Sequence, residues 1–370
     1  MDFSFIGDSA VSIATAVVAF LFVLTVVVFF HELGHFLVAR WCGVRVETFS
    51  VGFGRELFGF TDRHQTRWKV GWVPLGGYVK FLGDENAASA PARGAAASHP
   101  ESFQAKSVGR RAAIVAAGPF ANFLLAIVIY ALMFSIVGKP VTLPIIDSVQ
   151  AGSAAEEAGF LPGDRILEID GRRIGSFSDI TRIVEHSAGL TLSVLVERDG
   201  GEVMLEATPR LQEKEVPFGG TIRTGLLGIA SSGAAQSFEV QRYDPLTAVW
   251  AGVEETYFVI ESTLGYLGGV IAGRHSADQL GGPIKIAQIS GQAASLGFLV
   301  LVNLVALLSV SIGLINLFPI PVLDGGHLVF FAIEAVRGKP LSEAVQDLGF
   351  RIGLAMVLML MLFATWNDLV

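Results

Sequence analysis

The chain has 370 residues, of which 52% are hydrophobic and only 16% charged, and its mean hydropathy is +0.58. Because an average soluble domain has roughly 25% charged residues, this composition excludes a disordered chain and an ordinary cytosolic enzyme, and it indicates an integral membrane protein. The single cysteine, Cys42, excludes an internal disulfide, and the net charge of −8 argues against a nucleic-acid partner.

Four apolar stretches are long enough to cross a bilayer as helices, which takes about 20 residues each. The first has an acidic start and no basic region before it, so we expect a permanent span rather than a cleaved signal peptide. The predicted fold class is a polytopic α-helical membrane protein with four transmembrane helices. The spans are placed at residues 1–40, 112–138, 297–327 and 348–368.

Basic residues predict the orientation, because cytoplasmic loops of membrane proteins carry an excess of Lys and Arg. Residues 41–111, together with Arg40, hold 11 Lys/Arg against 6 Asp/Glu, and residues 328–347 include Arg337 and Lys339. We expect both loops on the cytoplasmic side. Both termini and the acidic segment 139–297 are then expected on the outer side.

The first span ends in His31-Glu32-Leu33-Gly34-His35. On a helix, His31 and His35 leave the same face one turn apart, and this spacing lets both imidazoles bind one Zn²⁺. Glu32 beside them can accept a proton from water and pass it to a leaving amine. A carboxylate inside a bilayer also needs a compensating partner, so the pattern favours a catalytic metal site over two structural histidines.

Residues 67–83 of the first cytoplasmic loop read RWKVGWVPLGGYVKFLG. Apolar alternation around Leu75, Gly76 and Gly77 predicts a β-hairpin, and its apolar character predicts that it is membrane-associated. An edge strand there can pair with an unwound substrate segment, so Gly76, Gly77 and Tyr78 are candidate substrate-binding residues. A hairpin packed on the protein surface is the alternative.

Residues 140–231 predict a small soluble α/β module, and residues 240–296 predict an amphipathic helix followed by a linker. Ser153 is a plausible N-cap of a short helix that Gly159 stops. The order of elements is that of a PDZ domain, and residues 152–173 resemble PDZ sequences. The expected strands and helices are Leu143–Val149, Ser153–Gly159, Arg165–Ile169, Ser178–Ser187, Leu190–Arg198 and Glu202–Thr208.

A catalytic zinc usually has three protein ligands and one open position. The end of the third span offers two candidates for the third ligand, Asp324 and His327, and physical reasoning does not separate them cleanly. A carboxylate and the two glycines that follow it favour Asp324. Because the spans alternate in direction, this end lies on the same side of the membrane as His31 and His35.

Pro319 and Pro321 remove two backbone donors and cannot continue a regular helix. Irregular backbone exposed to lipid is costly, so this break is expected to line a cavity inside the protein. Asn316 can hydrogen-bond an extended substrate there, or it can bond a neighbouring helix. Asn122, at the start of the second span, is expected to have a structural role only.

The set of motifs is similar to that of the site-2 protease family of intramembrane zinc metalloproteases, and within it to the bacterial RseP-like branch. The resemblance rests on HELGH, on GPFAN at residues 118–122, on the PDZ-like insert and on NLFPIPVLDGGH at residues 316–327. It implies that His31, His35 and Asp324 bind one Zn²⁺ and that Glu32 is the catalytic base. It also implies that Asn316, Pro319 and Pro321 lie near the substrate.

The resemblance further implies a bacterial inner-membrane enzyme that cleaves a transmembrane segment of a single-pass protein, such as an anti-sigma factor already trimmed outside the membrane. The RseP-like relatives carry two tandem PDZ domains, whereas this chain has room for one. The expected partners are this substrate, a peptide ligand of the PDZ domain and membrane lipid. An inactive PDZ-bearing scaffold and a metal transporter are the alternatives, and the intact HELGH and LDGGH motifs argue against the scaffold.

Overall fold

A computed structural model describes residues 4–83, 99–185, 187–215, 221–231, 238–271 and 281–369. Two compact units account for the chain. Unit 1 comprises Met1–Ala131, Val249–Thr263 and Ser276–Val370, and unit 2 comprises Leu132–Ala248 and Leu264–His275.

Among the described residues, four helices are long and apolar enough to cross a membrane, in agreement with the predicted class of multi-pass helical membrane protein. Shorter or less apolar helices accompany them in the described part of the chain. The four spans lie in α1 (Ser4–Trp41), α2 (Val108–Ile136), α7 (Phe298–Asn316) and α9 (Glu343–Leu369). The accompanying helices are α5 (Pro245–Ile271), α6 (Pro283–Leu296) and α8 (Asp324–Arg337).

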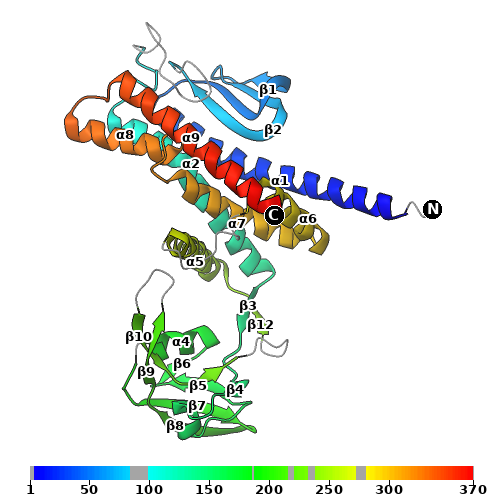
Figure 1. Ribbon diagram of the computed structural model, residues 1–370, viewed down its shortest axis with the longest axis vertical. Helices are drawn as coiled ribbons and strands as arrows, with labels where there is room; N and C mark the ends of the chain where they lie inside the picture. The colour runs from blue at the N-terminus through cyan, green and yellow to red at the C-terminus, as the bar shows by residue number, and fades with distance from the viewer. Residues whose placement is uncertain are drawn as a thin grey trace. The chain divides into compact units, whose positions relative to one another are not determined.

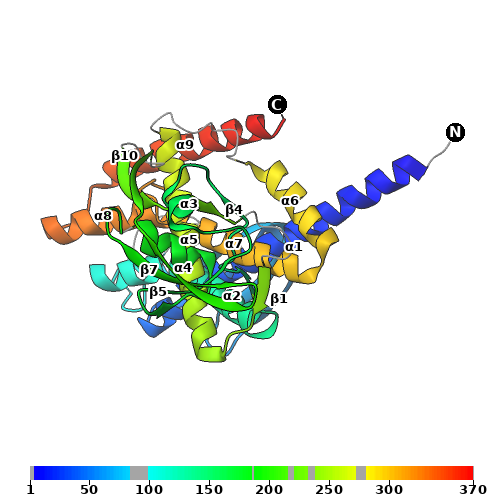
Figure 2. The same cartoon turned by 90° about the horizontal axis from the view of Figure 1, so that it is seen from below.

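Helix α1 is the central element of unit 1, because α2, α6 and α7 all pack against it. Val23 and Val27 of α1 are buried in one apolar cluster with Leu125 of α2 and with Leu304 and Val305 of α7. Both views show the N-terminal end of α1 extending past the other helices of unit 1 (Figures 1 and 2). The C-terminal half of α1, which carries HELGH, is therefore the part enclosed by the bundle.

Strands β1 (Val46–Thr61) and β2 (Arg67–Phe81) form a sheet that contacts α1. Residues 48–51 of β1 pair with residues 77–80 on one side and with residues 67–70 on the other. Residues 77–80 run antiparallel to residues 48–51 and residues 67–70 run parallel to them, so β2 reverses its direction between residues 70 and 77. The two arms of the predicted hairpin are therefore present, but a segment of β1 lies between them and they do not pair with each other. Gly76, at the end of this reversal, has φ +109°, a conformation that favours glycine.

The segment between α7 and α8 brings the third span to an end at Asn316 rather than at residue 327. Residues 328–347 were predicted to be a loop, but α8 occupies the first half of them and α9 starts at Glu343. Gly325 and Gly326 explain how α8 can begin so soon after the Pro-rich break. A Cβ atom on Gly325 would lie 2.3 Å from the Leu317 carbonyl oxygen, and one on Gly326 would lie 2.4 Å from that of Ile320.

The described residues of unit 2 form a four-stranded antiparallel sheet in the order β6-β5-β7-β8, with the helices α3 and α4 and three two-stranded pairs. Its core is apolar and includes Ile146, Ile166, Ile180 and Val194, all at most 1% exposed. The elements are β3 (Lys139–Thr142), β4 (Ser148–Val149), α3 (Ala154–Ala158), β5 (Arg165–Ile169), β6 (Arg172–Arg173), α4 (Phe177–Glu185), β7 (Leu192–Arg198), β8 (Gly201–Ala207), β9 (Arg210–Glu215), β10 (Thr221–Leu226), β11 (Ile229–Ala230) and β12 (Phe238–Gln241).

Several local predictions for unit 2 hold. Ser153 caps α3 by accepting a hydrogen bond from the Glu156 backbone N–H, Gly159 ends it in the left-handed region, and β5 has the predicted bounds. The expected strand at residues 143–149 is wrong: only its last two residues are in a strand, β4, and β3 precedes it. The predicted end of the second helix, at residues 186 and 187, includes residue 186, which lies outside the described residues.

Candidate metal centre and active site

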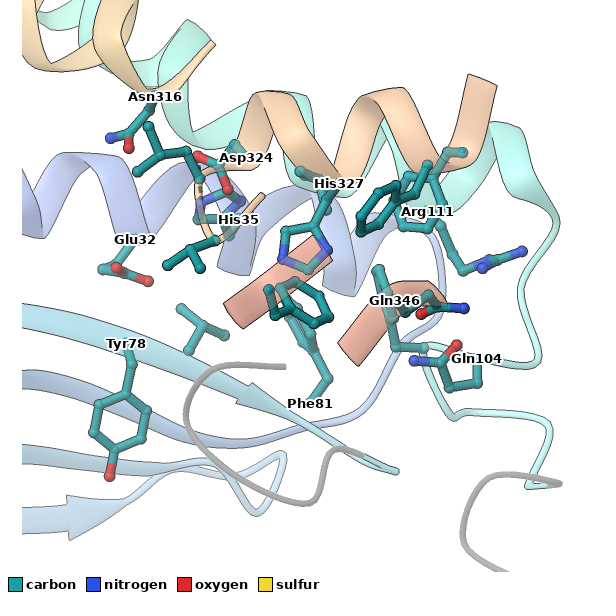
Figure 3. Close-up of a pocket in the computed structure, with 18 of the residues that line it drawn as sticks. Glu32, His35, Tyr78, Phe81, Gln104, Arg111, Asn316, Asp324, His327 and Gln346 are labelled. Carbon is teal, nitrogen blue, oxygen red and sulfur yellow. Dashed lines mark ion pairs between the residues drawn. The ribbon is translucent and has the colours of Figure 1, made fainter. Parts of the chain in front are cut away.

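Three side chains from α1 and α8 converge on one point in unit 1. The Nε2 atom of His31 lies 3.3 Å from the Nε2 atom of His35. The Asp324 Oδ2 atom lies 3.2 Å from the first of these nitrogens and 3.6 Å from the second. His31, His35 and Asp324 thus form a group that can hold one metal ion, and Figure 3 shows Asp324 beside His35.

Helix α2 packs closely against the rings of His31 and His35 because the residue of α2 at this contact, Gly118, is a glycine. A Cβ atom on Gly118 would lie 2.3 Å from His35 Nε2 and 2.9 Å from His31 Cε1. Gly34, between the histidines on α1, would place a Cβ 2.2 Å from the Ala117 carbonyl oxygen. Both glycines allow the backbones of α1 and α2 to approach closely at the level of the site.

The hydrogen bonding of His35 fixes which of its nitrogens faces the group. Its Nδ1 atom lies 2.9 Å from the Ile114 carbonyl oxygen, and a carbonyl can only accept, so Nδ1 carries the proton. The Nε2 lone pair then points at the Asp324 carboxylate, whose Oδ2 is buried without a hydrogen-bond partner among the described residues. Electron pairs facing each other at these distances repel unless a cation lies between them.

The spacing of the three atoms fits Zn²⁺. Zinc bonds to imidazole nitrogen and carboxylate oxygen are about 2.0–2.2 Å long and arranged as a tetrahedron, which puts neighbouring ligand atoms about 3.3–3.6 Å apart. The observed separations are 3.2, 3.3 and 3.6 Å. Three protein ligands also leave one position open, as catalytic zinc sites require.

His327, the other candidate for the third ligand, is not a member of the group of three. It lines the same cavity, and its ring packs against that of Phe350 with the centroids 5.3 Å apart. Figure 3 shows the imidazole farther along α8, on the side away from Glu32. The geometry therefore favours Asp324 over His327.

Glu32 lies between the metal group and the sheet. Its carboxylate accepts a hydrogen bond from the Val79 backbone N–H of β2, and a Cβ on Gly77 would lie 3.2 Å from its Cγ. Since Val79 pairs with Phe49 of β1 on its other side, the edge of β2 that faces away from β1 is the edge that faces Glu32. The candidate base and a strand edge therefore share one cavity.

That cavity has a volume of about 440 Å³, and its lining includes the three candidate ligands, Glu32 and His327. Among the predicted substrate-binding residues, Asn316, Gly77 and Tyr78 also line it. The Tyr78 ring extends away from Glu32 (Figure 3) and stacks on Phe53, with 6.1 Å between centroids.

Three predicted substrate-binding residues lie beyond this lining. Gly76 packs against the Phe53 ring, where a Cβ would approach a ring carbon to 2.6 Å. Pro319 is exposed, and Pro321 contacts α9, where a Cβ on Gly353 would overlap the Pro321 carbonyl oxygen. The two prolines therefore shape the break that delivers Asp324, and Val322, at φ +95°, carries the backbone strain of that turn.

Sequence reasoning overlooked part of the site. Gly118 was noted only as the start of a motif, and Asn122 was given a structural role, although its Nδ2 atom lies 3.3 Å from His31 Nδ1. Arg111 and Glu334 form a partly buried ion pair of 2.6 Å in the lining of the cavity. The signal for the first two was the GPFAN motif, while no local pattern links Arg111 to Glu334.

Two histidines one helical turn apart, a carboxylate from a second element and a glutamate next to the first histidine define a zinc metalloprotease, here among helices able to span a membrane. The chain belongs to peptidase family M50, the site-2 proteases, whose family model matches residues 19–360. The membership confirms the family resemblance, and with it the enzyme class and zinc as the metal.

Similar proteins from other bacteria agree with this assignment. A candidate zinc metalloprotease of Rhizobium meliloti (strain 1021) is 54% identical over 95% of both chains. Another from Brucella suis biovar 1 (strain 1330) is 47% identical over 99% of this chain and 97% of the relative. Metalloprotease MmpA of Caulobacter vibrioides is 43% identical over 95% of this chain and 94% of its own length.

Proposed function

We infer that this protease hydrolyses a peptide bond within or near the transmembrane segment of a single-pass membrane protein. The main supporting observation is that His31, Glu32 and His35 lie on α1, an apolar helix of membrane length, beside the edge of β2 that faces Glu32. Asp324 follows the end of α7, a second such helix. A general base among such helices is expected for a protease whose substrates lie in the membrane. A substrate segment that enters laterally from the bilayer meets this site directly.

In the proposed mechanism His31, His35 and Asp324 hold the metal. Zn²⁺ bound there would supply a Lewis acid that polarises the scissile carbonyl and lowers the pKa of a water, so that the water gives up a proton readily as it attacks. Glu32 takes the proton from the attacking water and delivers it to the nitrogen of the leaving amine. The Val79 N–H holds the Glu32 carboxylate in place for both transfers.

A transmembrane helix hides its peptide bonds in its own hydrogen-bond ladder, so the substrate has to unwind before hydrolysis. The edge of β2 at Gly77 and Val79 offers backbone groups on the side of Glu32, because residues two apart on a strand face the same way. We propose that the unwound segment adds to this edge as a strand, and that Asn316 binds its backbone from the end of α7.

Unit 2 is proposed to be a single PDZ domain outside the inner membrane that binds a peptide C-terminus or restricts substrate access. The order of short strands and two helices supports this assignment. The excess of basic residues in segment 40–111 supports a cytoplasmic position for the β1–β2 sheet. An anti-sigma factor already cut outside the membrane is the proposed substrate, and its cleavage would release a transcriptional response.

The experiment is a proteomic comparison of membrane fragments from cells with the wild-type enzyme and cells with Glu32→Gln. The proposal expects fragments that end inside a predicted transmembrane segment and occur only with the wild-type enzyme. Fragments that end only in soluble loops would contradict intramembrane cleavage. Purified wild-type protein, incubated in proteoliposomes with the candidate substrate, should reproduce the same ends.

A further inference from the structure

Asn122 of α2 lies against one of the candidate metal ligands, and its surroundings are fully buried. Its side chain is 0% exposed, and its Nδ2 atom lies 3.3 Å from His31 Nδ1. The other nitrogen of the same ring, Nε2, faces Asp324 and His35. The imidazole of His31 is therefore held between the metal group on one side and the Asn122 amide on the other.

The two histidines are supported from behind by different groups. His35 donates from Nδ1 to the Ile114 carbonyl oxygen, which presents its own Nε2 lone pair to the metal. His31 needs the same tautomer to be a ligand through Nε2, so its Nδ1 must also donate a proton. The Asn122 side chain is the group placed to accept that proton.

A buried atom without a partner points to the same arrangement. Asn122 Oδ1 is buried and has no hydrogen-bond partner among the described residues, and leaving such an acceptor unsatisfied costs about 1–3 kcal/mol. A half-turn of the amide about its last side-chain bond exchanges Oδ1 with Nδ2. Oδ1 then accepts from His31 Nδ1–H, and both groups are satisfied with His31 in the tautomer that a metal ligand requires.

The backbone of Asn122 is fixed independently of its side chain. Ser309 of α7, itself 0% exposed, donates its hydroxyl to the Asn122 carbonyl oxygen at 2.8 Å. A Cβ on Gly313, one turn later on α7, would lie 3.2 Å from the Asn122 Cβ. Helix α7 thus holds the position from which the amide reaches His31.

We propose that Asn122 is a positioning residue for the metal centre: its side-chain oxygen accepts the His31 Nδ1 proton and so fixes the ring orientation and tautomer in which Nε2 binds zinc. The residue touches neither substrate nor metal. This inference rests on His31 being a metal ligand. Outer-shell partners of ligating histidines typically change metal affinity by about 10–100-fold when they are removed.

The test measures zinc affinity, by competition with a chelating dye, for purified full-length protein in detergent. Asn122→Leu removes the acceptor at similar volume, and zinc affinity should fall about 10–100-fold. Asn122→Asp keeps an acceptor but cannot donate, so its affinity should stay within a few-fold of the wild type. Ser311→Ala, the matched control on the same helix, removes a hydroxyl that donates to the Leu307 carbonyl oxygen within α7 and should leave zinc affinity unchanged.

Each outcome is decisive. Wild-type zinc affinity in Asn122→Leu would overturn the proposal. A loss of zinc affinity in Asn122→Asp as large as that in Asn122→Leu would also overturn it, because that result is expected if Asn122 acts as a donor or only by packing. Thermal unfolding of the zinc-free protein shows whether Asn122→Leu folds without metal. If it does not, the zinc affinity of Asn122→Asp alone tests the proposal. His31→Ala should lose zinc; if it keeps wild-type affinity, the ligand assignment fails instead.

Discussion

Asp324 Oδ2 lies 3.2 Å from His31 Nε2, although the two residues belong to helices near opposite ends of the chain. The contact requires α1 and α8 to be fixed against each other to within a fraction of an ångström. Phe36 and Phe331, from the same two helices, are buried in one apolar cluster with Phe49 and Phe81 of the sheet. The packing that forms the fold therefore also forms the metal centre.

Replacing Glu32 with glutamine should abolish cleavage while zinc remains bound. The amide cannot accept the proton of the attacking water, and loss of a general base typically lowers rates by about 10²–10⁴-fold. Zinc content per chain and cleavage of a transmembrane substrate are measured on the same preparation. Glu56→Gln is the matched control, since Glu56 lies on β1, pairs with Arg67 and does not line the cavity. Cleavage at the wild-type rate by Glu32→Gln would refute the assignment of the base.

Asp324→Ala should weaken zinc binding, whereas His327→Ala should not. The first removes one of the three converging ligand atoms, and the second removes a ring that packs on Phe350 outside this group. Zinc retained after dialysis against a graded series of chelator concentrations separates the two variants. The reverse order, with zinc lost only from His327→Ala, would show that the wrong residue of LDGGH had been assigned as the ligand.

A single methyl group on Gly118 should disrupt the metal centre. The added Cβ would lie 2.3 Å from His35 Nε2, closer than atoms can pack, so the imidazole has to move away from Asp324. Gly118→Ala should therefore bind zinc more weakly than the wild type, with cleavage reduced in parallel. Gly109→Ala, on the same helix with open space around the added atom, should keep both properties. Equal behaviour of the two variants in chelator competition would contradict the described approach of α2 to the histidines.

In unit 2, Arg198 should stabilise the fold at neutral pH through Asp164. Burial disfavours ionisation of Asp164, but two hydrogen bonds from Arg198 and one from the Leu161 N–H outweigh it and lower the carboxyl pKa from its usual 3.8. A lowered pKa contributes stability that is present above the unfolded-state value and is lost as pH falls through the folded-state value.

Arg198→Met leaves the Asp164 carboxylate buried without its cation, which should cost about 3 kcal/mol. Hydrogen exchange of the β5 and β7 amides in the full-length protein measures this loss of stability. The difference between the variant and the wild type should shrink below about pH 4, where Asp164 becomes protonated in the unfolded chain. Arg173→Gln breaks an exposed pair with Glu168 and should change exchange little. A loss of protection that is equally large at pH 3 and pH 7 would contradict the ion-pair explanation.

The sequence predicted the features that depend on local pattern and on apolar length. Four spans, the HELGH histidines on one helical face and the Ser153 and Gly159 caps follow from residue spacing alone. Asp324 and His327 were not separable, because both follow the same break and lie within one turn. Which of them reaches α1 depends on the close contact of Gly325 and Gly326 with the backbone of residues 317–321.

The pairing within the sheet could not be predicted, for a different reason. Residues 50–54 include Gly52 and Gly54, and glycine is depleted in strands, so the local sequence there does not predict one. In the structure, Gly52 has φ +86° and Gly54 has φ +85°, conformations open to glycine that let β1 bend while it pairs with β2 on both sides. The insertion of residues 48–51 between the two arms of β2 is a long-range pairing, which the spacing of residues does not encode.

Zinc K-edge X-ray absorption of the purified wild-type protein tests the central claim most directly. The account predicts one zinc per chain, with two imidazole nitrogens and a carboxylate oxygen at about 2.0–2.2 Å and with the carboxylate oxygen missing in Asp324→Ala. A spectrum that contains a sulfur ligand, or one that is the same in the wild type and Asp324→Ala, would contradict a metal centre built from His31, His35 and Asp324.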